Sequence, residues 1–245
     1  MTVYNKILDA QKANKKQFAL LIDPDKTKNT SLGDLVNLAI ESKVDFFFIG
    51  GSLIIDDNLD NCIDTIKNSC DIPVVLFPGS TLQVNKKADA ILFLSLISGR
   101  NPEMLIGNHV IAAPYIKKSG IEVLPTGYIL IDSGKTTSVS YISNTIPIPS
   151  EKKDIAACTA MAGEMLGLQF TFMDGGSGAL NPISKEMIAS VRSHTKNPLI
   201  TGGGIATPEK AIENCKAGAD IIVVGNAIEK DSSIIKNIAD AIHSL

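Results

Sequence analysis

The sequence predicts an α/β fold, a modified (β/α)8 TIM barrel in which the third helix is missing or replaced. Eight short apolar runs are typical of strands buried on both faces of a parallel sheet. Helix-length amphipathic segments lie between most of these runs, which indicates right-handed strand–helix–strand units. The length of 245 residues is close to the roughly 250 residues of a closed eight-stranded barrel. No linker or repeat divides the chain, so we expect one domain over residues 1–245.

Each predicted strand is a short, mainly apolar run followed by polar or glycine-rich residues. The strands are expected at residues 17–23, 44–50, 72–79, 88–95, 128–132, 168–174, 198–204 and 219–226. Amphipathic periodicity predicts connecting helices, among them residues 31–43, 101–118 and 207–219.

The connection between the third and fourth strands departs from this pattern. Only STLQVNKKA (80–88) joins them, which is too short for a helix that covers a strand together with its turns. One interpretation is a trimmed or 3₁₀ connection without consequence. The other is that the missing helix leaves a groove along the barrel wall, suited to a long apolar ligand.

The composition argues against several classes of protein. The chain has 23 basic and 26 acidic residues, a net charge of −3 and no Trp, so neither a basic footprint nor an aromatic stacking platform for nucleic acid is present. Four cysteines without metal-ligand spacing are expected to be reduced core residues. The N-terminus lacks the apolar stretch of a signal peptide, and no segment reaches the ~18 apolar residues of a membrane span. We expect a cytoplasmic protein, although its substrate could still be a lipid.

Glycine clusters follow the predicted strands at the end where barrel enzymes carry their active sites. The stretches are GGS (50–52), PGS (78–80), DGGSG (174–178), GGG (202–204) and GN (225–226). Bare backbone N–H groups after the last strands, followed by a helix start at Thr207-Pro208, are typical of a phosphate site. Structural packing is the alternative explanation for these glycines.

The stretch FMDGGSG (172–178) places a carboxylate directly before three glycines and a serine. Gly175, Gly176, Ser177 and Gly178 are predicted to extend the anion site. Asp174 at the strand tip is interpreted as a general base, an anchor for a ligand hydroxyl or a helix N-cap.

A second acidic stretch, LLIDPDKT (20–27), ends the first strand. Carboxylates beside a phosphate site suggest Mg²⁺, which binds through few carboxylates and keeps ligand oxygens and waters. Asp23 and Asp25 are the candidates, with one of them free to cap a neighbouring segment. Ser52, at the tip of the next strand, could complete the site. None of the three histidines, His109, His194 and His243, is placed as a catalytic group would be.

Several of these stretches appear together and in order in one known family. They are LIDPDK (21–26), FFFIGGS (46–52), LFPGS (76–80), FLSLISGRNPEMLIG (93–107), LPTGYILID (124–132), FMDGGSGA (172–179), TGGGIATPE (201–209) and ADIIVVGNAIEKD (219–231). From about residue 17 to its end, the chain resembles the geranylgeranylglyceryl phosphate synthases of the group with the IDPDK motif, which are related to bacterial heptaprenylglyceryl phosphate synthases.

The resemblance implies a phosphoglycerol geranylgeranyltransferase that joins sn-glycerol 1-phosphate to geranylgeranyl diphosphate in an ether bond, releases diphosphate and uses Mg²⁺. It implies Asp23 and Ser52 as magnesium ligands. The positions that match the family's glycerol phosphate site are Phe172, Met173, Asp174, Gly175, Gly176, Ser177, Gly178, Gly203, Gly204, Gly225 and Asn226. Asp174 would be the proton acceptor. The expected partners are these two substrates, a second copy of the chain and, transiently, membrane lipid products.

Three positions depart from the family pattern. The family's strand-six motif usually carries Tyr and Glu where this chain has Phe172 and Asp174. Leu21 stands where other groups have a lysine, so Lys26 or Arg100 would have to serve as the cation for phosphate or diphosphate. The alternatives are the same reaction with another prenyl chain length, a phosphosugar isomerase, and a non-catalytic relative that binds a phosphate ligand.

Overall fold

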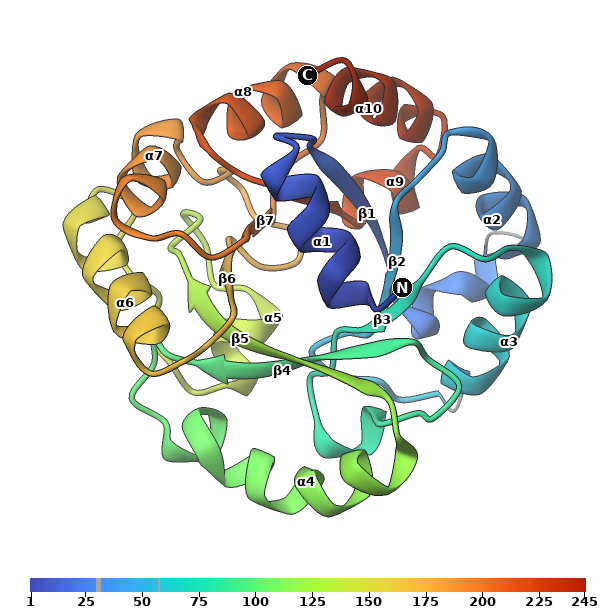
Figure 1. The fold of residues 1–245 in the computed structure, drawn as a ribbon, viewed down its shortest axis with the longest axis horizontal. Coiled ribbons are helices and arrows are strands. Elements are labelled where there is room, and N and C mark those ends of the chain that lie inside the picture. The colour runs from blue at the N-terminus through green and yellow to red at the C-terminus, as the bar shows by residue number, and fades with distance from the viewer. Residues whose placement is uncertain (30–31, 57) are drawn as a thin grey trace.

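The eight strands close into a barrel of parallel neighbours in sequence order, from β1 to β8 (Figure 1). The computed structural model describes residues 1–29, 32–56 and 58–245. Closure is made by β1 and β8, which pair from Gln17↔Ile221 to Leu20↔Val224. The strands are β1 Gln17–Ile22, β2 Phe46–Ile49, β3 Val74–Leu76, β4 Ala90–Leu96, β5 Glu122–Leu130, β6 Phe170–Asp174, β7 Leu199–Gly202 and β8 Ile221–Val224. The predicted fold class is confirmed.

The predicted fifth strand starts too late. It was expected at 128–132, but β5 begins at Glu122 and pairs with β4 from Ala90↔Glu122 to Leu96↔Tyr128. Its first half contains Glu122, Pro125 and Thr126, which hide the apolar run. Glu122 has a separate use, because its carboxylate accepts hydrogen bonds from the N–H groups of Val3 (2.6 Å) and Tyr4 (3.0 Å) at the start of α1.

The longer helices surround the barrel, except α1, which crosses its N-terminal end, and the short helices α5 and α9 lie inside this ring (Figure 1). They are α1 Val3–Lys12, α2 Leu32–Glu41, α3 Leu59–Ser69, α4 Asn108–Ser119, α5 Ser138–Ile142, α6 Lys153–Met165, α7 Lys185–His194, α8 Pro208–Ala217, α9 Asn226–Lys230 and α10 Ile234–His243. The predicted helix at 101–118 begins as a π-helical segment, η3 Glu103–Gly107, and continues as α4. Ser31, the first residue of the helix predicted at 31–43, lies outside the described residues.

Only a single 3₁₀ turn, η2 Thr81–Gln83, stands between β3 and β4, as the short connection predicted. Gln83 on this turn is 4% exposed, and its amide links two loops. It donates to the Gly51 carbonyl (3.0 Å) after β2 and accepts from the Gly79 N–H (3.1 Å) after β3. The turn that replaces the third helix therefore fixes the loop that carries Ser52.

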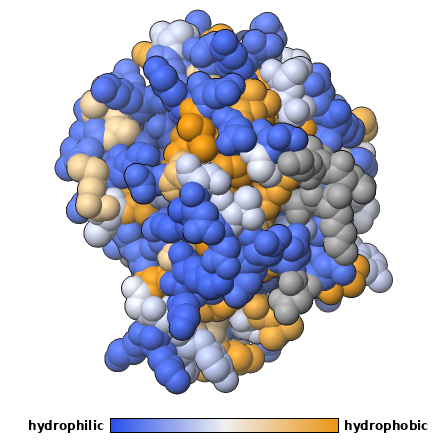
Figure 2. Space-filling model, turned by 90° about the vertical axis from the view of Figure 1, so that its right-hand side faces the viewer, coloured by the Kyte–Doolittle hydropathy of each residue, from blue (hydrophilic) through white to orange (hydrophobic). Residues whose placement is uncertain are grey.

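Two apolar clusters separate the inside of the barrel from its outer wall. Phe46, Phe48, Phe170 and Phe172 belong to the inner cluster, into which α1 inserts Val3 and Ile7. The outer cluster packs the opposite faces of the strands against the helices. On the side that carries α2 and α3 the surface is mostly hydrophilic, with separate apolar patches (Figure 2). The helices therefore turn their apolar faces mainly inward.

All four cysteines are free thiols. Cys62 and Cys215 are buried, as predicted, but Cys158 is exposed on α6, so the expectation of a core residue is wrong there. No helix in the part of the chain that the structure describes is long and apolar enough to cross a lipid bilayer.

Candidate active site

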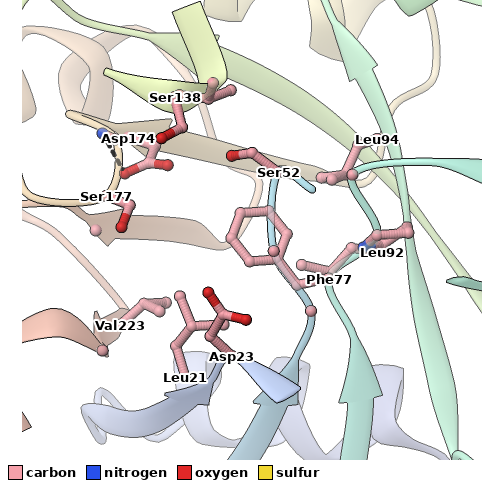
Figure 3. A pocket seen from close by; sticks show the side chains of 18 of the residues that line it. Leu21, Asp23, Ser52, Phe77, Leu92, Leu94, Ser138, Asp174, Ser177 and Val223 are labelled. Atoms are coloured by element: carbon pink, nitrogen blue, oxygen red, sulfur yellow. Dashed lines mark hydrogen bonds between the residues drawn. The ribbon is translucent and has the colours of Figure 1, made fainter. Parts of the chain in front are cut away.

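A cavity of about 620 Å³ opens at the C-terminal end of the barrel, opposite α1. Loops after β1, β2, β3, β6, β7 and β8 surround it, and inward-facing side chains of β4 and β5 form its floor. In Figure 3 the side chains of Ser138, Asp174 and Ser177 lie together on one side, whereas Leu92 and Leu94 lie on the opposite side. The cavity thus has a polar and an apolar part.

Asp174 is the buried carboxylate of the polar part, with 8% of its surface exposed. Its Oδ2 accepts a hydrogen bond from the Tyr128 hydroxyl at 2.5 Å, and its Oδ1 accepts one from the Gly176 N–H at 2.8 Å. Of the three interpretations of Asp174, the helix N-cap is ruled out, because no helix begins here; α7 starts at Lys185 and is capped by Ser184. Asp174 is therefore free to act on a ligand.

Burial raises the pKa of the Asp174 carboxyl above its usual value, and the hydrogen bonds from Tyr128 and Gly176 oppose that rise. Burial and the charge of Asp174 together raise the pKa of Tyr128 well above its usual value. The phenol therefore stays protonated and donates a hydrogen bond to the carboxylate. A carboxylate with a raised pKa is a stronger proton acceptor than an exposed one.

Phe172 fills the space beside this pair. Its ring stacks on Phe77 with centroids 5.1 Å apart and meets Tyr128 edge-on at 5.5 Å. The position therefore contributes packing and no hydroxyl, as the departure from the family motif predicted. The phenol next to the carboxylate comes from the neighbouring strand β5 instead.

The glycines after β6 and β7 allow two loops to touch. Gly203 has φ +84°, and a Cβ there would lie 2.6 Å from the Gly175 nitrogen and 2.8 Å from Asp174 Oδ1. Packing is therefore the reason for glycine at 203, as the alternative explanation held. It does not exclude ligand binding, because Gly203 and Gly204 also line the cavity.

Most of the predicted glycerol phosphate residues line the cavity together. Ser177 donates to the Asn226 side-chain carbonyl at 2.7 Å, which joins the loop after β6 to the start of α9. The predicted residues that line the cavity are Phe172, Asp174, Gly176, Ser177, Gly178, Gly203, Gly204, Gly225 and Asn226. Met173 and Gly175 do not: Met173 belongs to the outer cluster, because alternate strand residues face opposite sides.

Asp23, directly after β1, and Ser52, in the loop after β2, point into the same cavity (Figure 3). Gly51 packs against the carboxyl of Asp23, since a Cβ there would lie 3.4 Å from it. Asp25 has a different role: its two oxygens accept the N–H groups of Ile55 (2.7 Å) and Asp56 (3.0 Å). It ties the turn after β1 to the loop after β2, so Asp23 is the aspartate available to a metal.

A cation shared by few side chains fits this arrangement. Within residues 1–29, 32–56 and 58–245, no three His, Cys, Asp or Glu side chains gather into a metal site. Mg²⁺ does not require such a cluster, because it takes one or two protein ligands together with phosphate oxygens and water. A carboxylate and a hydroxyl that face one cavity are suitable for it.

The two candidate cations have different positions. Lys26 lines the cavity, where its ammonium lies 3.3 Å from Asp23 and 3.2 Å from Glu229. Partial burial lowers its pKa, but the charges of Glu229 and Asp23 outweigh that effect and raise it. Arg100 bonds to the carbonyls of Ser98 and Gly99 and does not line the cavity. Arg100 is therefore not a cation of this site.

The apolar part of the cavity continues outside the barrel wall, past the turn η2. Val84, Ile91, Phe93, Ala112 and Ile116 line it between the outer face of β4 and α4. This is where the third helix is absent, so the groove interpretation is supported. His109 also lines it, with its ring edge-on to Phe93 at 4.4 Å; partial burial lowers the pKa of His109, so the imidazole there is neutral.

Tyr128 is the residue of this site that the sequence reasoning missed. It lies in the stretch LPTGYILID (124–132), which supported the family resemblance but was given no role in the site. Alternation along the strand could have found it, because Leu124 and Tyr128 are four residues apart and face the same inner side.

Known proteins match this chain over most of its length, both in sequence and in fold. The PcrB family model matches residues 11–242. A geranylgeranylglyceryl phosphate synthase of Chitinophaga pinensis is 60% identical over 242 residues, covering 99% of this chain and 96% of that protein. The synthase of Thermococcus kodakarensis is 43% identical over 218 residues, covering 89% and 86%.

The solved structure of the (S)-3-O-geranylgeranylglyceryl phosphate synthase of Thermoplasma acidophilum, in complex with its substrate sn-glycerol-1-phosphate, has a TM-score of 0.94. The two chains are 32% identical and each is covered completely. The tryptophan synthase α subunit of Legionella pneumophila, at 18% identity and a TM-score of 0.63, shares the fold alone.

The Tyr128–Asp174 hydrogen bond generates the first prediction. Replacing Tyr128 with Phe removes a donor that holds the pKa of Asp174 down, so we expect that pKa to rise further. Titration of ¹³C-labelled aspartate by NMR measures the shift. Tyr115→Phe, on the exposed face of α4, is the control and should leave the Asp174 pKa where it is. An unaltered Asp174 pKa in the Tyr128 variant would show that the bond does not act on the carboxylate.

Proposed function

This chain belongs to the PcrB family, and we propose that its cavity joins sn-glycerol 1-phosphate to geranylgeranyl diphosphate through an ether bond, releasing diphosphate. The chain is thus a geranylgeranyltransferase of ether-lipid biosynthesis. We assign both substrates to this cavity because its polar and apolar parts are continuous. A glycine-lined polar end beside Asp174 runs into an apolar groove between β4 and α4.

The polar end suits the glycerol phosphate. Backbone N–H groups of the loops after β6, β7 and β8, together with the Asn226 amide, can surround an anion there. A glycerol hydroxyl held beside Asp174 would then lie close to the point where the groove begins. Positioning of this kind converts a bimolecular encounter into a reaction within one complex.

Asp174 is the proton acceptor in this proposal. As the C1–O bond to the diphosphate breaks, the glycerol oxygen forms the ether bond to C1 and its proton passes to the Asp174 carboxylate. The negative charge leaves with the diphosphate. Tyr128 keeps the carboxylate in one orientation through its hydrogen bond to Oδ2, which leaves the remaining lone pairs for the substrate hydroxyl.

Mg²⁺ is the proposed cofactor, and Asp23 and Ser52 are the residues that would hold it. When bound, it would supply charge neutralisation for the diphosphate leaving group. Lys26, which already contacts Asp23, adds a fixed positive charge on the same side of the cavity. Other groups of the family have a lysine at the position of Leu21, and Lys26 is our candidate for the same role in this chain.

Assembly into a homo-oligomer, transient contact with lipid product and a cytoplasmic location also belong to this proposal. What supports the first two is a set of exposed apolar side chains around the groove. Leu82 of η2, Ile106 of η3, and Val110, Ile111 and Tyr115 of α4 are exposed on this wall. Exposed apolar side chains gathered around a groove are typical of contact surfaces.

The reaction is tested by incubating the protein with radiolabelled geranylgeranyl diphosphate, sn-glycerol 1-phosphate and Mg²⁺. We expect a labelled ether phosphate from the wild type, and a rate lower by about 10²–10⁴-fold for Asp174→Asn, because general base catalysis contributes that much. Calorimetry with sn-glycerol 1-phosphate should show that the variant still binds it. A wild type that binds this ligand and forms no product would favour the non-catalytic alternative.

The metal proposal is tested with Asp23→Asn. We expect turnover supported by Mg²⁺ to fall by more than about 100-fold, since even outer-shell partners of a metal are worth 10–100-fold. Asp25→Asn is the matched control: it weakens the contact to Ile55 and Asp56 and should cost stability while retaining Mg²⁺-dependent turnover. Equal Mg²⁺ dependence of wild type and the Asp23 variant would remove Asp23 from the metal site.

The groove is tested with a large side chain at its wall. Ala112 is buried against the groove and Ala113, its neighbour on α4, is exposed. Ala112→Trp should raise the KM for geranylgeranyl diphosphate and shift preference toward shorter prenyl diphosphates, because the ring occupies the path of the tail. Ala113→Trp should do neither. The same preference in all three proteins would mean that the tail lies elsewhere.

A further inference from the structure

The loop after β5, residues 131–137, lies on the glycine-rich loop after β6 through several close contacts. The Ser133 carbonyl accepts a hydrogen bond from the Asn181 N–H at 3.0 Å. A Cβ on Gly176 would lie 2.7 Å from the Thr137 hydroxyl, and one on Gly134 would lie 2.7 Å from the Asn181 amide nitrogen. The two loops therefore form one wall of the polar end of the cavity.

This packing brings the ammonium of Lys135 to the anion site. A Cβ on Gly178 would lie 3.6 Å from Lys135 Nζ and also 3.6 Å from Asn226 Nδ2. Two hydrogen-bond donors from distant parts of the chain thus converge on the same glycine. Gly178 and Asn226 both line the cavity.

The ammonium of Lys135 is exposed and unpaired within the part of the chain that the structure describes. No Asp or Glu within the described residues forms an ion pair with it, and its side chain is exposed. Lys26, by contrast, already contacts both Asp23 and Glu229. The positive charge of Lys135 is therefore available to a bound anion.

We propose that Lys135 is a positioning residue that binds the phosphate of sn-glycerol 1-phosphate over the Gly178–Asn226 edge of the cavity. The inference rests on the proposed function for the identity of the ligand. Backbone N–H groups hold an anion through partial charges, and Lys135 adds a full positive charge. Its attraction for the anion is strongest at low salt, where screening is weakest. Lys135 stands on the loop that leads into α5, whose first residue, Ser138, lines the cavity.

The test compares Lys135→Gln, Lys135→Arg and two further variants. Lys230→Gln removes a lysine that lines the cavity, and Lys236→Gln removes an exposed lysine on α10. Calorimetry with sn-glycerol 1-phosphate and with inorganic phosphate gives Kd at low and at high potassium chloride. We expect Lys135→Gln to weaken both ligands about tenfold at low salt and to reduce the salt dependence, with Lys135→Arg close to wild type.

Steady-state kinetics provide the readout that a merely structural role would not give. The KM for sn-glycerol 1-phosphate should rise about tenfold in Lys135→Gln, while kcat and the KM for geranylgeranyl diphosphate remain near wild type. A Kd within twofold of wild type, an effect confined to Lys230→Gln, or a rise in the KM for the diphosphate instead would each overturn the proposal. Failure of the proposed function is distinguishable, because the wild type itself would then form no ether product.

Discussion

The burial of one carboxylate organises the polar end of this barrel. Asp174 stands at the tip of β6 under the loop after β7, and that loop can approach only because Gly203 has no side chain. An ionisable group in such a place costs free energy unless donors surround it. Tyr128 and Gly176 supply two hydrogen bonds, and the raised pKa that remains is what makes the carboxylate a useful proton acceptor.

The absence of a helix between β3 and β4 determines the shape of the apolar end of the cavity. With a single 3₁₀ turn and no helix between β3 and β4, the cavity continues between the outer face of β4 and α4. The same turn contributes Gln83, which ties the loops after β2 and β3 together. One short segment thus leaves room for the apolar groove and fixes the loop that carries Ser52, one of the two residues proposed to hold a metal. The two ends of the cavity can take a charged and an apolar substrate at once.

Features that depend on residues close together in the sequence could be predicted, whereas features that depend on contacts between distant segments could not. The alternation of strands and helices, the connection at 80–88 that is too short for a helix, and the helix start at Thr207-Pro208 depend on local pattern, and each was predicted. The choice among the three roles of Asp174, the choice between Lys26 and Arg100, and the burial of Cys158 depend on what lies nearby in space; the sequence left the first two open, and the third expectation was wrong. The start of β5 was missed because Glu122 serves α1, 118 or more residues away along the chain.

The sequence by itself determined the barrel, the end of it that carries chemistry and the family, because strand periodicity, glycine placement and ordered motifs are all readable along one dimension. Only the tertiary structure decided which groups meet. Tyr128 reaches Asp174 from a neighbouring strand, Asp25 accepts hydrogen bonds from the backbone of the loop after β2, and Lys135 reaches Gly178 from the adjoining loop after β5. Such contacts depend on barrel closure, which sets side chains from different strands within a few ångströms, and no local pattern encodes that distance.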